Sequence, residues 1–189
     1  MKRCLLIAAL VMATGSLLYA QAPQGELEVY YQTIRSFDFD SGSPQFSISD
    51  EAFQGGGFGF VFYLNDWFGL FSNTSLYGGI EQNAIDLKLI NQVQGVKLIA
   101  RDIGIFNVYT KGGIGFARYV FGLGNLGETV RYGTSFLAAA GLEVRMTDHI
   151  YLLLEGNQTS LSLPDISGSP DRDKWDSTVG FLTGIAIQF

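Results

Sequence analysis

Seven charged residues stand on a single face of alternating stretches, where their types and spacing could act together chemically. In residues 96–101, for example, Lys97 and Arg101 alternate with Val96 and Leu98. Side chains along a strand point to opposite faces in turn, so the charges avoid the face that carries the large apolar residues. Mixed charges in one interior can form an ion-pair network or line a narrow path for a solute. The seven residues are Glu28, Lys97, Arg101, Lys111, Glu143, Arg145 and Glu155.

Two short motifs suggest ligands but lack the context that those ligands need. Gly122 to Gly127 matches G-x-G-x-x-G, yet a dinucleotide site requires this motif to open a helix after a buried strand. Here it lies in a Gly-rich stretch that favours a surface loop. Asp171 to Asp176 is rich in aspartate but lacks the turn glycine and the twelfth-position Glu of a calcium loop. We therefore assign no cofactor and no metal site.

Eight alternating stretches must position the seven charges. In the second stretch Phe58, Phe60 and Phe62 share one face, and Gly57 and Gly59 share the other. Such alternation is typical of strands with two chemically different sides. The stretches lie between four long loops, at residues 36–52, 78–84, 121–132 and 163–175, and three short turns, at residues 65–67, 102–104 and 147–149. Long and short connections therefore alternate along the chain.

The last fourteen residues, Asp176 to Phe189, show most clearly what surrounds the sheet. Ile185, Ile187 and Phe189 lie on one face, and small or weakly polar residues lie on the other. Large apolar residues that continue to the end of the chain fit a strand whose outer face meets lipid. The predicted fold is all-β, an eight-stranded antiparallel up-and-down transmembrane β-barrel. Placing Lys or Arg on its lipid face would cost ~2–4 kcal/mol at the midplane, so the charges should face inward.

The N-terminus predicts export from the cytoplasm. Lys2 and Arg3 precede an apolar run that ends in small residues near Ala20, the pattern of a secretory signal peptide. We expect residues 1–20 to be removed and residues 21–189 to form the barrel domain. Cys4 is the only cysteine and would leave with the signal, so no disulfide is expected. Without Lys2 and Arg3 the net charge falls from −6 to −8, which argues against a nucleic-acid partner.

The chain resembles the small eight-stranded outer-membrane barrels of the OmpA/OmpX and opacity-protein type over its whole mature length. The features that carry the resemblance are Glu26-Leu-Glu-Val-Tyr-Tyr, Asn65-Asp-Trp-Phe-Gly-Leu, Lys111-Gly-Gly-Ile-Gly-Phe-Ala, Ala140-Gly-Leu-Glu-Val-Arg and the terminal Ile187-Gln-Phe. The resemblance implies an outer-membrane location in a Gram-negative-type bacterium, with both termini periplasmic and four loops outside. It also implies that the assembly machinery recognises the terminal strand, with Ile185, Ile187 and Phe189 as the signal.

Some barrels of this size are lipid-modifying enzymes, and this chain is a poor match to them. Their chemistry resembles Ser–His arrangements, in which the histidine deprotonates the hydroxyl. His149 is the only histidine, follows Asp148 in a predicted periplasmic turn, and has no serine within two residues. A turn histidine is the preferred interpretation. We therefore assign no catalytic residue and expect a protein that is not an enzyme.

Two functions of different classes remain open. The favoured one is a structural or surface-interaction protein, a monomer in outer-membrane lipids whose loops meet an extracellular ligand or a host surface. The alternative is a small passive channel, with a lipid-modifying enzyme as a distant third. Because an eight-stranded barrel is only wide enough for its own side chains, the seven charges are expected to fill the interior rather than line a pore.

Overall fold

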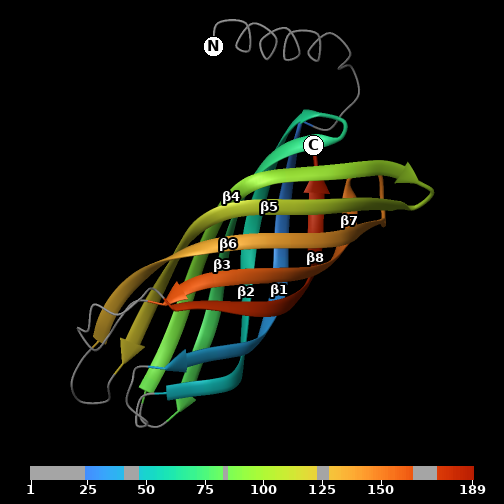
Figure 1. Ribbon diagram of the computed structural model, residues 1–189. Helices are drawn as coiled ribbons and strands as arrows, with labels where there is room; N and C mark the ends of the chain where they lie inside the picture. The colour runs from blue at the N-terminus through green and yellow to red at the C-terminus, as the bar shows by residue number, and fades with distance from the viewer. Residues whose placement is uncertain (1–23, 41–46, 83–84, 123–127, 164–173) are drawn as a thin grey trace, which may run out of the picture.

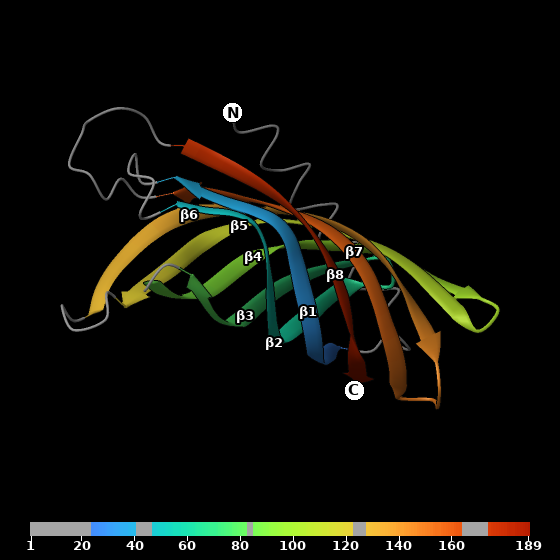
Figure 2. The ribbon, with the colours of Figure 1, turned by 90° about the horizontal axis from the view of Figure 1, so that it is seen from below.

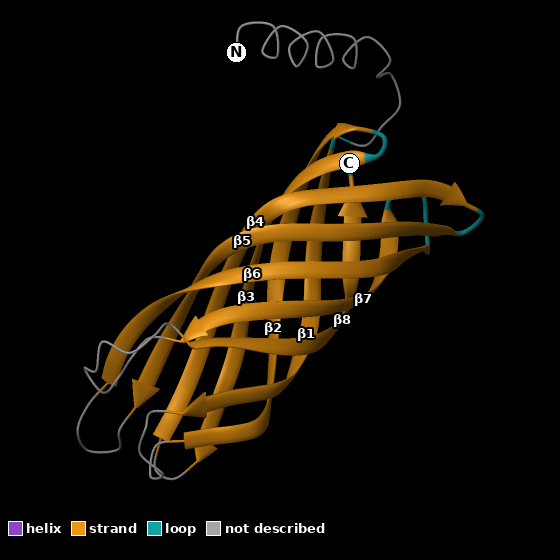
Figure 3. Ribbon diagram, in the orientation of Figure 1, coloured by secondary structure: helices purple, strands orange, loops and turns teal. Residues whose placement is uncertain are grey.

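The computed structural model describes residues 24–40, 47–82, 85–122, 128–163 and 174–189, and they form one closed antiparallel barrel (Figures 1 and 3). Each strand pairs with the next along the chain, and β1 pairs with β8 to complete the ring. This confirms the predicted fold class. Within the described residues no helix is long and apolar enough to span a membrane. The strands are β1 (Gly25–Asp40), β2 (Ser47–Asn65), β3 (Phe68–Gln82), β4 (Ile85–Ile103), β5 (Phe106–Gly122), β6 (Glu128–Arg145), β7 (Ile150–Leu163) and β8 (Lys174–Gln188).

The strands run obliquely around an elongated barrel, and its two ends differ (Figures 1 and 2). The turns β2–β3, β4–β5 and β6–β7 lie at one end together with Gly25 and Phe189, and we call it the turn end. The connections β1–β2, β3–β4, β5–β6 and β7–β8 lie at the other, the loop end. Gly104 in the β4–β5 turn has a φ of 72°, a left-handed conformation that glycine adopts without strain.

Alternation places large apolar side chains outside and polar or small ones inside. Phe58, Phe60 and Phe62 on β2 are exposed, while Tyr63 and Val61 are buried. Glycines on neighbouring strands make room for tyrosine rings in the narrow interior. Tyr109 lies opposite Gly141 on β6, where an added Cβ would come 2.5 Å from the Tyr109 Cζ. Ring and glycine therefore fit together as a pair, as aromatic residues and glycines do in other barrels.

The strands extend further toward the loop end than predicted. The structure leaves 41–46, 83–84, 123–127 and 164–173 between strands, where the prediction had loops of 7 to 17 residues. The prediction of a long second loop is wrong, because β3 continues to Gln82 and pairs with Ile85 on β4. Polar residues such as Glu81 and Asp86 interrupt the apolar alternation at the strand ends, so the alternation does not predict these ends. Their backbones nevertheless pair across β3 and β4 like those of the other strand residues.

At the β2–β3 turn Phe68 pairs with Asn65, and an irregularity in the ladder separates Tyr63 from Asn65. The predicted signal peptide, residues 1–20, lies outside the described residues, as does most of the Gly122–Gly127 motif.

The interior has an apolar layer toward the loop end and a mixed layer toward the turn end. The loop-end layer contains Ile34, Phe53, Tyr77, Leu87, Leu89, Ala117, Tyr119, Phe121 and Leu161. The turn-end layer packs apolar residues such as Val61, Phe71 and Leu153 around the buried charges. Each layer brings together inward-facing residues from strands that lie far apart in the sequence.

Candidate functional site

Six buried charged residues form an ion-pair cluster in the turn-end half of the barrel. Lys97 Nζ on β4 lies 2.5 Å from Glu26 Oε1, 3.2 Å from Glu28 Oε1 and 2.6 Å from Glu143 Oε1. Lys111 Nζ on β5 lies 2.7 Å from Glu28 Oε2 and 3.3 Å from Glu155 Oε2. We call Glu26, Glu28, Lys97, Lys111, Glu143 and Glu155 the ion-pair cluster. All six side chains are almost completely excluded from solvent.

Neutral side chains donate hydrogen bonds to the carboxylates of the cluster. Tyr63 Oη and Gln188 Nε2 each donate to Glu26 Oε2 at 2.8 Å. Asn107 Nδ2 donates to Glu143 Oε2 at 2.9 Å, and Tyr109 Oη donates to Glu155 Oε2 at 3.0 Å. A buried ion pair is tolerated only when its remaining lone pairs and protons are satisfied, and these donors meet that condition.

Both ammonium groups of the cluster lie close to the Tyr109 ring. Lys97 Nζ is 4.5 Å and Lys111 Nζ is 5.1 Å from the ring centroid. The negative face of an aromatic ring attracts cations, so Tyr109 stabilises both lysines as well as Glu155. Its position opposite Gly141 is what allows the ring to lie across the interior.

Five of the seven predicted interior charges belong to the cluster, and two lie at the turn end. Arg101 is partly exposed; its Nε donates to the Asp66 carbonyl at 3.0 Å and its Nη1 to Gln188 Oε1 at 3.1 Å. Arg145 requires a correction, because its side chain is exposed at the last residue of β6 instead of filling the interior. Arg145 alternates in phase with the inward-facing Glu143, but β6 ends at Arg145. The cation that contacts Glu143 within the buried cluster is Lys97.

The prediction omitted several residues that complete the cluster. Glu26 has the same phase as Glu28, and Asn107 the same phase as Tyr109, so the alternation itself could have identified both. Gln188, which alternates with the outward Ile187 and Phe189, connects Glu26, Glu143 and Arg101. Its place near the C-terminus brings β8 into a network that otherwise draws on β1, β2, β4, β5, β6 and β7.

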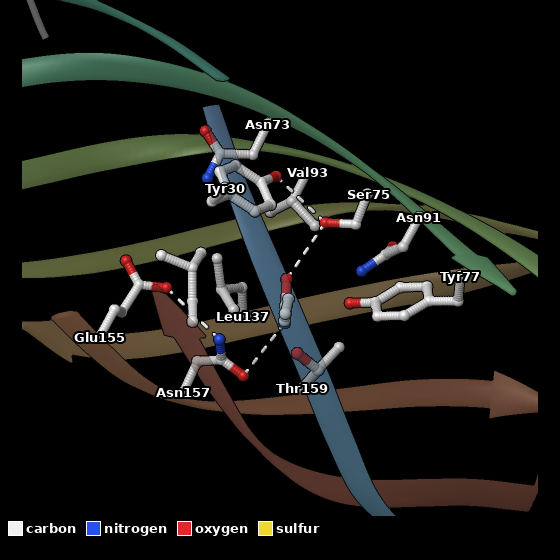
Figure 4. Close-up of a pocket in the computed structure, with 12 residues that line it drawn as sticks. Tyr30, Asn73, Ser75, Tyr77, Asn91, Val93, Leu137, Glu155, Asn157 and Thr159 are labelled. Atoms are coloured by element: carbon white, nitrogen blue, oxygen red, sulfur yellow. Dashed lines mark hydrogen bonds between the residues drawn. The ribbon is translucent and has the colours of Figure 1, made fainter. Parts of the chain in front are cut away.

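A second group of polar side chains lies next to the cluster on its loop-end side (Figure 4). Their hydrogen bonds form a continuous chain. Tyr30 and Ser75 share a hydrogen bond of 3.1 Å, and Ser75 Oγ donates to Gln32 Oε1 at 3.3 Å. Gln32 Nε2 donates to Asn157 Oδ1, and Asn157 Nδ2 donates to Glu155 Oε1, both at 3.4 Å. The chain therefore ends on a carboxylate of the cluster.

The residues considered for catalysis and assembly lie on the surface. His149 is exposed in the β6–β7 turn, where its backbone nitrogen donates to Thr147 Oγ1 at 3.3 Å. Ile185, Ile187 and Phe189 face outward, and the Phe189 backbone pairs with Gly25 through two hydrogen bonds of 3.0 Å. Within the described ranges, no three or more His, Cys, Asp or Glu residues are grouped so that they could hold a metal ion.

Comparisons with known proteins identify the fold. No family model and no curated sequence matches the chain. Among solved structures, Neisserial surface protein A is similar with a TM-score of 0.71 and 10% identity, over 89% of this chain and 99% of that one. OprG from Pseudomonas aeruginosa is similar with a TM-score of 0.60 and 11% identity, over 89% and 97% of the two chains. Ail of Yersinia pestis, in complex with the heparin analogue sucrose octasulfate, has a TM-score of 0.57 and 16% identity, over 89% and 100%.

Proposed function

We propose that this chain, which has the fold of the small eight-stranded outer-membrane β-barrels, is a non-enzymatic outer-membrane protein with a closed interior and interacting loops. The outward apolar residues of every strand support a position in lipid, since such a surface would be unfavourable in water. Gly25 and Phe189, at the two ends of the described barrel, lie at the turn end, which would face the periplasm. The assembly machinery and outer-membrane lipids would then be its partners in the envelope.

The closed interior is the observation that carries this proposal. A solute that entered from the turn end would meet the ion-pair cluster, where ammonium and carboxylate groups lie 2.5–3.3 Å apart. A solute that entered from the loop end would meet the apolar layer around Leu87, Tyr119 and Leu161. Opposite charges in contact in a space of low dielectric attract strongly, so the cluster opposes the passage of ions. Binding would then belong to the four connections at the loop end.

Conductance measurements test the closed interior. The purified protein in a planar lipid bilayer should give no steady single-channel conductance, because both layers must separate before ions pass. Steady, well-resolved conductance from the unmodified protein would favour the passive channel instead. The same measurement is made on Lys97→Met, which removes the central cation. Conductance of this variant would show that the non-conducting unmodified protein is inserted and closed by the cluster, and has not simply failed to insert.

Shortened loops test whether binding lies at the loop end. Leu163 and Lys174 are paired across β7 and β8, so residues 164–173 can be replaced by a two-residue turn without loss of the ladder. We expect this variant to remain heat-modifiable on gels but to lose adherence of intact cells to host surfaces. The same replacement of residues 123–127, between the paired residues Gly122 and Glu128, tests whether the β5–β6 connection contributes to adherence as well. Unchanged adherence with every loop shortened would contradict the proposal.

A further inference from the structure

Four polar side chains stand together on the outward face of β3 and β4, in a surface that is otherwise apolar. Ser72 is the ladder partner of Gln94, and Thr74 is the partner of Gln92. All four have the outward phase of their strands and are half-buried or exposed. We call these four residues the polar island. Exposed apolar residues border it on all four sides: Phe58 and Phe60 on β2, Leu70 and Leu76 on β3, Val96 on β4, and Ile114 and Phe116 on β5.

The two amides of the polar island have no partner within the barrel. Elsewhere on the outward face, Gln158 Nε2 on β7 donates a hydrogen bond of 2.8 Å to Ser177 Oγ on β8. Neither Gln92 nor Gln94 forms a side-chain hydrogen bond or ion pair with any residue that the structure describes. Lipid chains offer no donors and no acceptors, so an unpaired amide among them is costly. In the bilayer, the polar island therefore needs a partner from outside its own barrel.

The stagger of the barrel determines how the four residues are arranged. Paired residues lead from Gly25 through each strand in turn and return to β1 at Arg35, ten residues nearer the loop end. The strands are therefore tilted, with a displacement of about one residue from each strand to the next. As a result, a residue of β4 lies nearer the loop end than its ladder partner on β3.

This arrangement makes the polar island complementary to itself. Gln92 and Ser72 lie one above the other along the barrel axis, and Thr74 and Gln94 lie beside each other between them. Copies that enter a membrane in one orientation can be related by a two-fold axis along the bilayer normal. An axis through the centre of the polar island brings Gln92 to Gln92, Ser72 to Ser72, and Thr74 to Gln94 of the second copy. Amides and hydroxyls both donate and accept, so each of these pairs can form a hydrogen bond.

We infer that the polar island is the contact between two copies of this chain in the membrane, in place of the monomer expected from the sequence. The inference rests on the proposed position in lipid. A second copy supplies matching donors and acceptors at the same depth, which lipid chains do not. Ser72 and Thr74 are also small, so the two barrel walls can approach closely, as membrane helices do at small residues.

Association in lipid vesicles tests the inference. The purified protein carries one dye at Asp66→Cys in the exposed β2–β3 turn, and energy transfer between donor-labelled and acceptor-labelled copies is measured at increasing ratios of protein to lipid. This reference protein should associate, with energy transfer that rises with the ratio. Gln92→Leu combined with Gln94→Leu should raise the dissociation constant at least about tenfold, because the hydrogen bonds between the copies are lost.

Two comparisons separate association from folding. The thermal unfolding midpoint of the double leucine variant in detergent should not fall, because leucine suits a lipid-facing surface and neither amide bonds within its own barrel. Gln158→Leu is the matched control on the outward face of β7. It removes the hydrogen bond to Ser177 and should leave the dissociation constant unchanged.

Disulfide formation locates the contact. Cys4 lies in the predicted signal peptide, so one introduced cysteine is the only thiol of the mature chain. Ser72→Cys faces its own copy across the proposed axis and should give a disulfide-linked dimer when membranes are oxidised with copper phenanthroline. Thr183→Cys is the matched control, an outward residue of β8, three strands from β3 around the ring, and should stay monomeric.

The outcomes distinguish this inference from the proposed function. An inserted, heat-modifiable reference protein without energy transfer would overturn the dimer and leave the position in lipid intact. Equal association of the double leucine variant, or equal disulfide yields at Ser72→Cys and Thr183→Cys, would also overturn it. A disulfide from Ser72→Cys to a different membrane protein alone would assign this face to that protein instead of a second copy. Failure of the unmodified chain to insert would contradict the position in lipid, and the dimer with it.

Discussion

Lys97 and Lys111 are direct partners across β4 and β5, so two like charges face each other in the barrel interior. Glu28 resolves this conflict, since its carboxylate lies 3.2 Å from Lys97 Nζ and 2.7 Å from Lys111 Nζ. Like charges at directly opposed positions destabilise a sheet. One carboxylate from β1, which is not adjacent to either strand, therefore makes the β4–β5 pairing favourable.

Glu28→Gln should destabilise the barrel strongly. The substitution preserves the shape but leaves the two ammonium groups without their shared counter-charge, and disruption of a buried pair costs about 3–5 kcal/mol. Urea unfolding in detergent, followed by tryptophan fluorescence, gives the free energy of unfolding. The control is Glu128→Gln, an exposed residue at the start of β6, which should change it by no more than about 0.5 kcal/mol. Equal effects of the two substitutions would refute the role of Glu28.

Glu143→Ala and Arg145→Ala should differ although they are two residues apart on β6. Glu143 is buried and accepts hydrogen bonds from Lys97 and Asn107, whereas Arg145 is exposed. We expect Glu143→Ala to lower the unfolding midpoint clearly and to permit sporadic conductance, because Lys97 loses one partner. Arg145→Ala should give no conductance in the planar lipid bilayer. A larger loss of stability from Arg145→Ala would show that the interior network extends to the rim.

Gly141→Val should disturb the cluster through Tyr109. The added Cβ would lie 2.5 Å from Tyr109 Cζ and 2.7 Å from the Leu154 carbonyl, so the ring and its hydrogen bond to Glu155 must shift. Overpacking of this kind typically costs about 1–3 kcal/mol. Gly156→Ala on β7 is the control, since an added methyl group there would meet no atom of the described residues within 4 Å beyond its chain neighbours. If both variants unfold at the same urea concentration, the pairing of ring and glycine has no energetic role.

Removal of Phe189, or Phe189→Asp, should reduce the amount of protein inserted in the outer membrane. Phe189 faces outward beside Phe60, with ring centroids 6.2 Å apart, and its backbone closes the β1–β8 seam. Quantification in membrane fractions against Asp171→Ala, which lies in the β7–β8 connection, separates a terminal effect from a general one. Comparable insertion of the terminal and loop variants would exclude Phe189 as an assembly signal.

Period-two alternation was sufficient to predict the wall of the barrel. It placed Phe58, Phe60 and Phe62 outside and Lys97 and Lys111 inside, because inward and outward environments differ sharply in polarity. It could not predict that Glu28 meets both lysines, since that contact crosses the barrel and depends on the register of several ladders. The exposure of Arg145 likewise depends on where β6 ends relative to the rim, which strand tilt decides and a local sequence pattern does not.

The distribution of the cluster over the strands has a consequence for how the barrel forms. The β4–β5 hairpin carries both lysines, the β6–β7 hairpin carries Glu143 and Glu155, and β1 carries Glu26 and Glu28. Neither of these hairpins can therefore neutralise its own share of the cluster, and each would bring a charge of two units into lipid if it inserted alone. We expect the hairpins to enter the bilayer together, with productive insertion requiring the complete chain and its complementary charges at once.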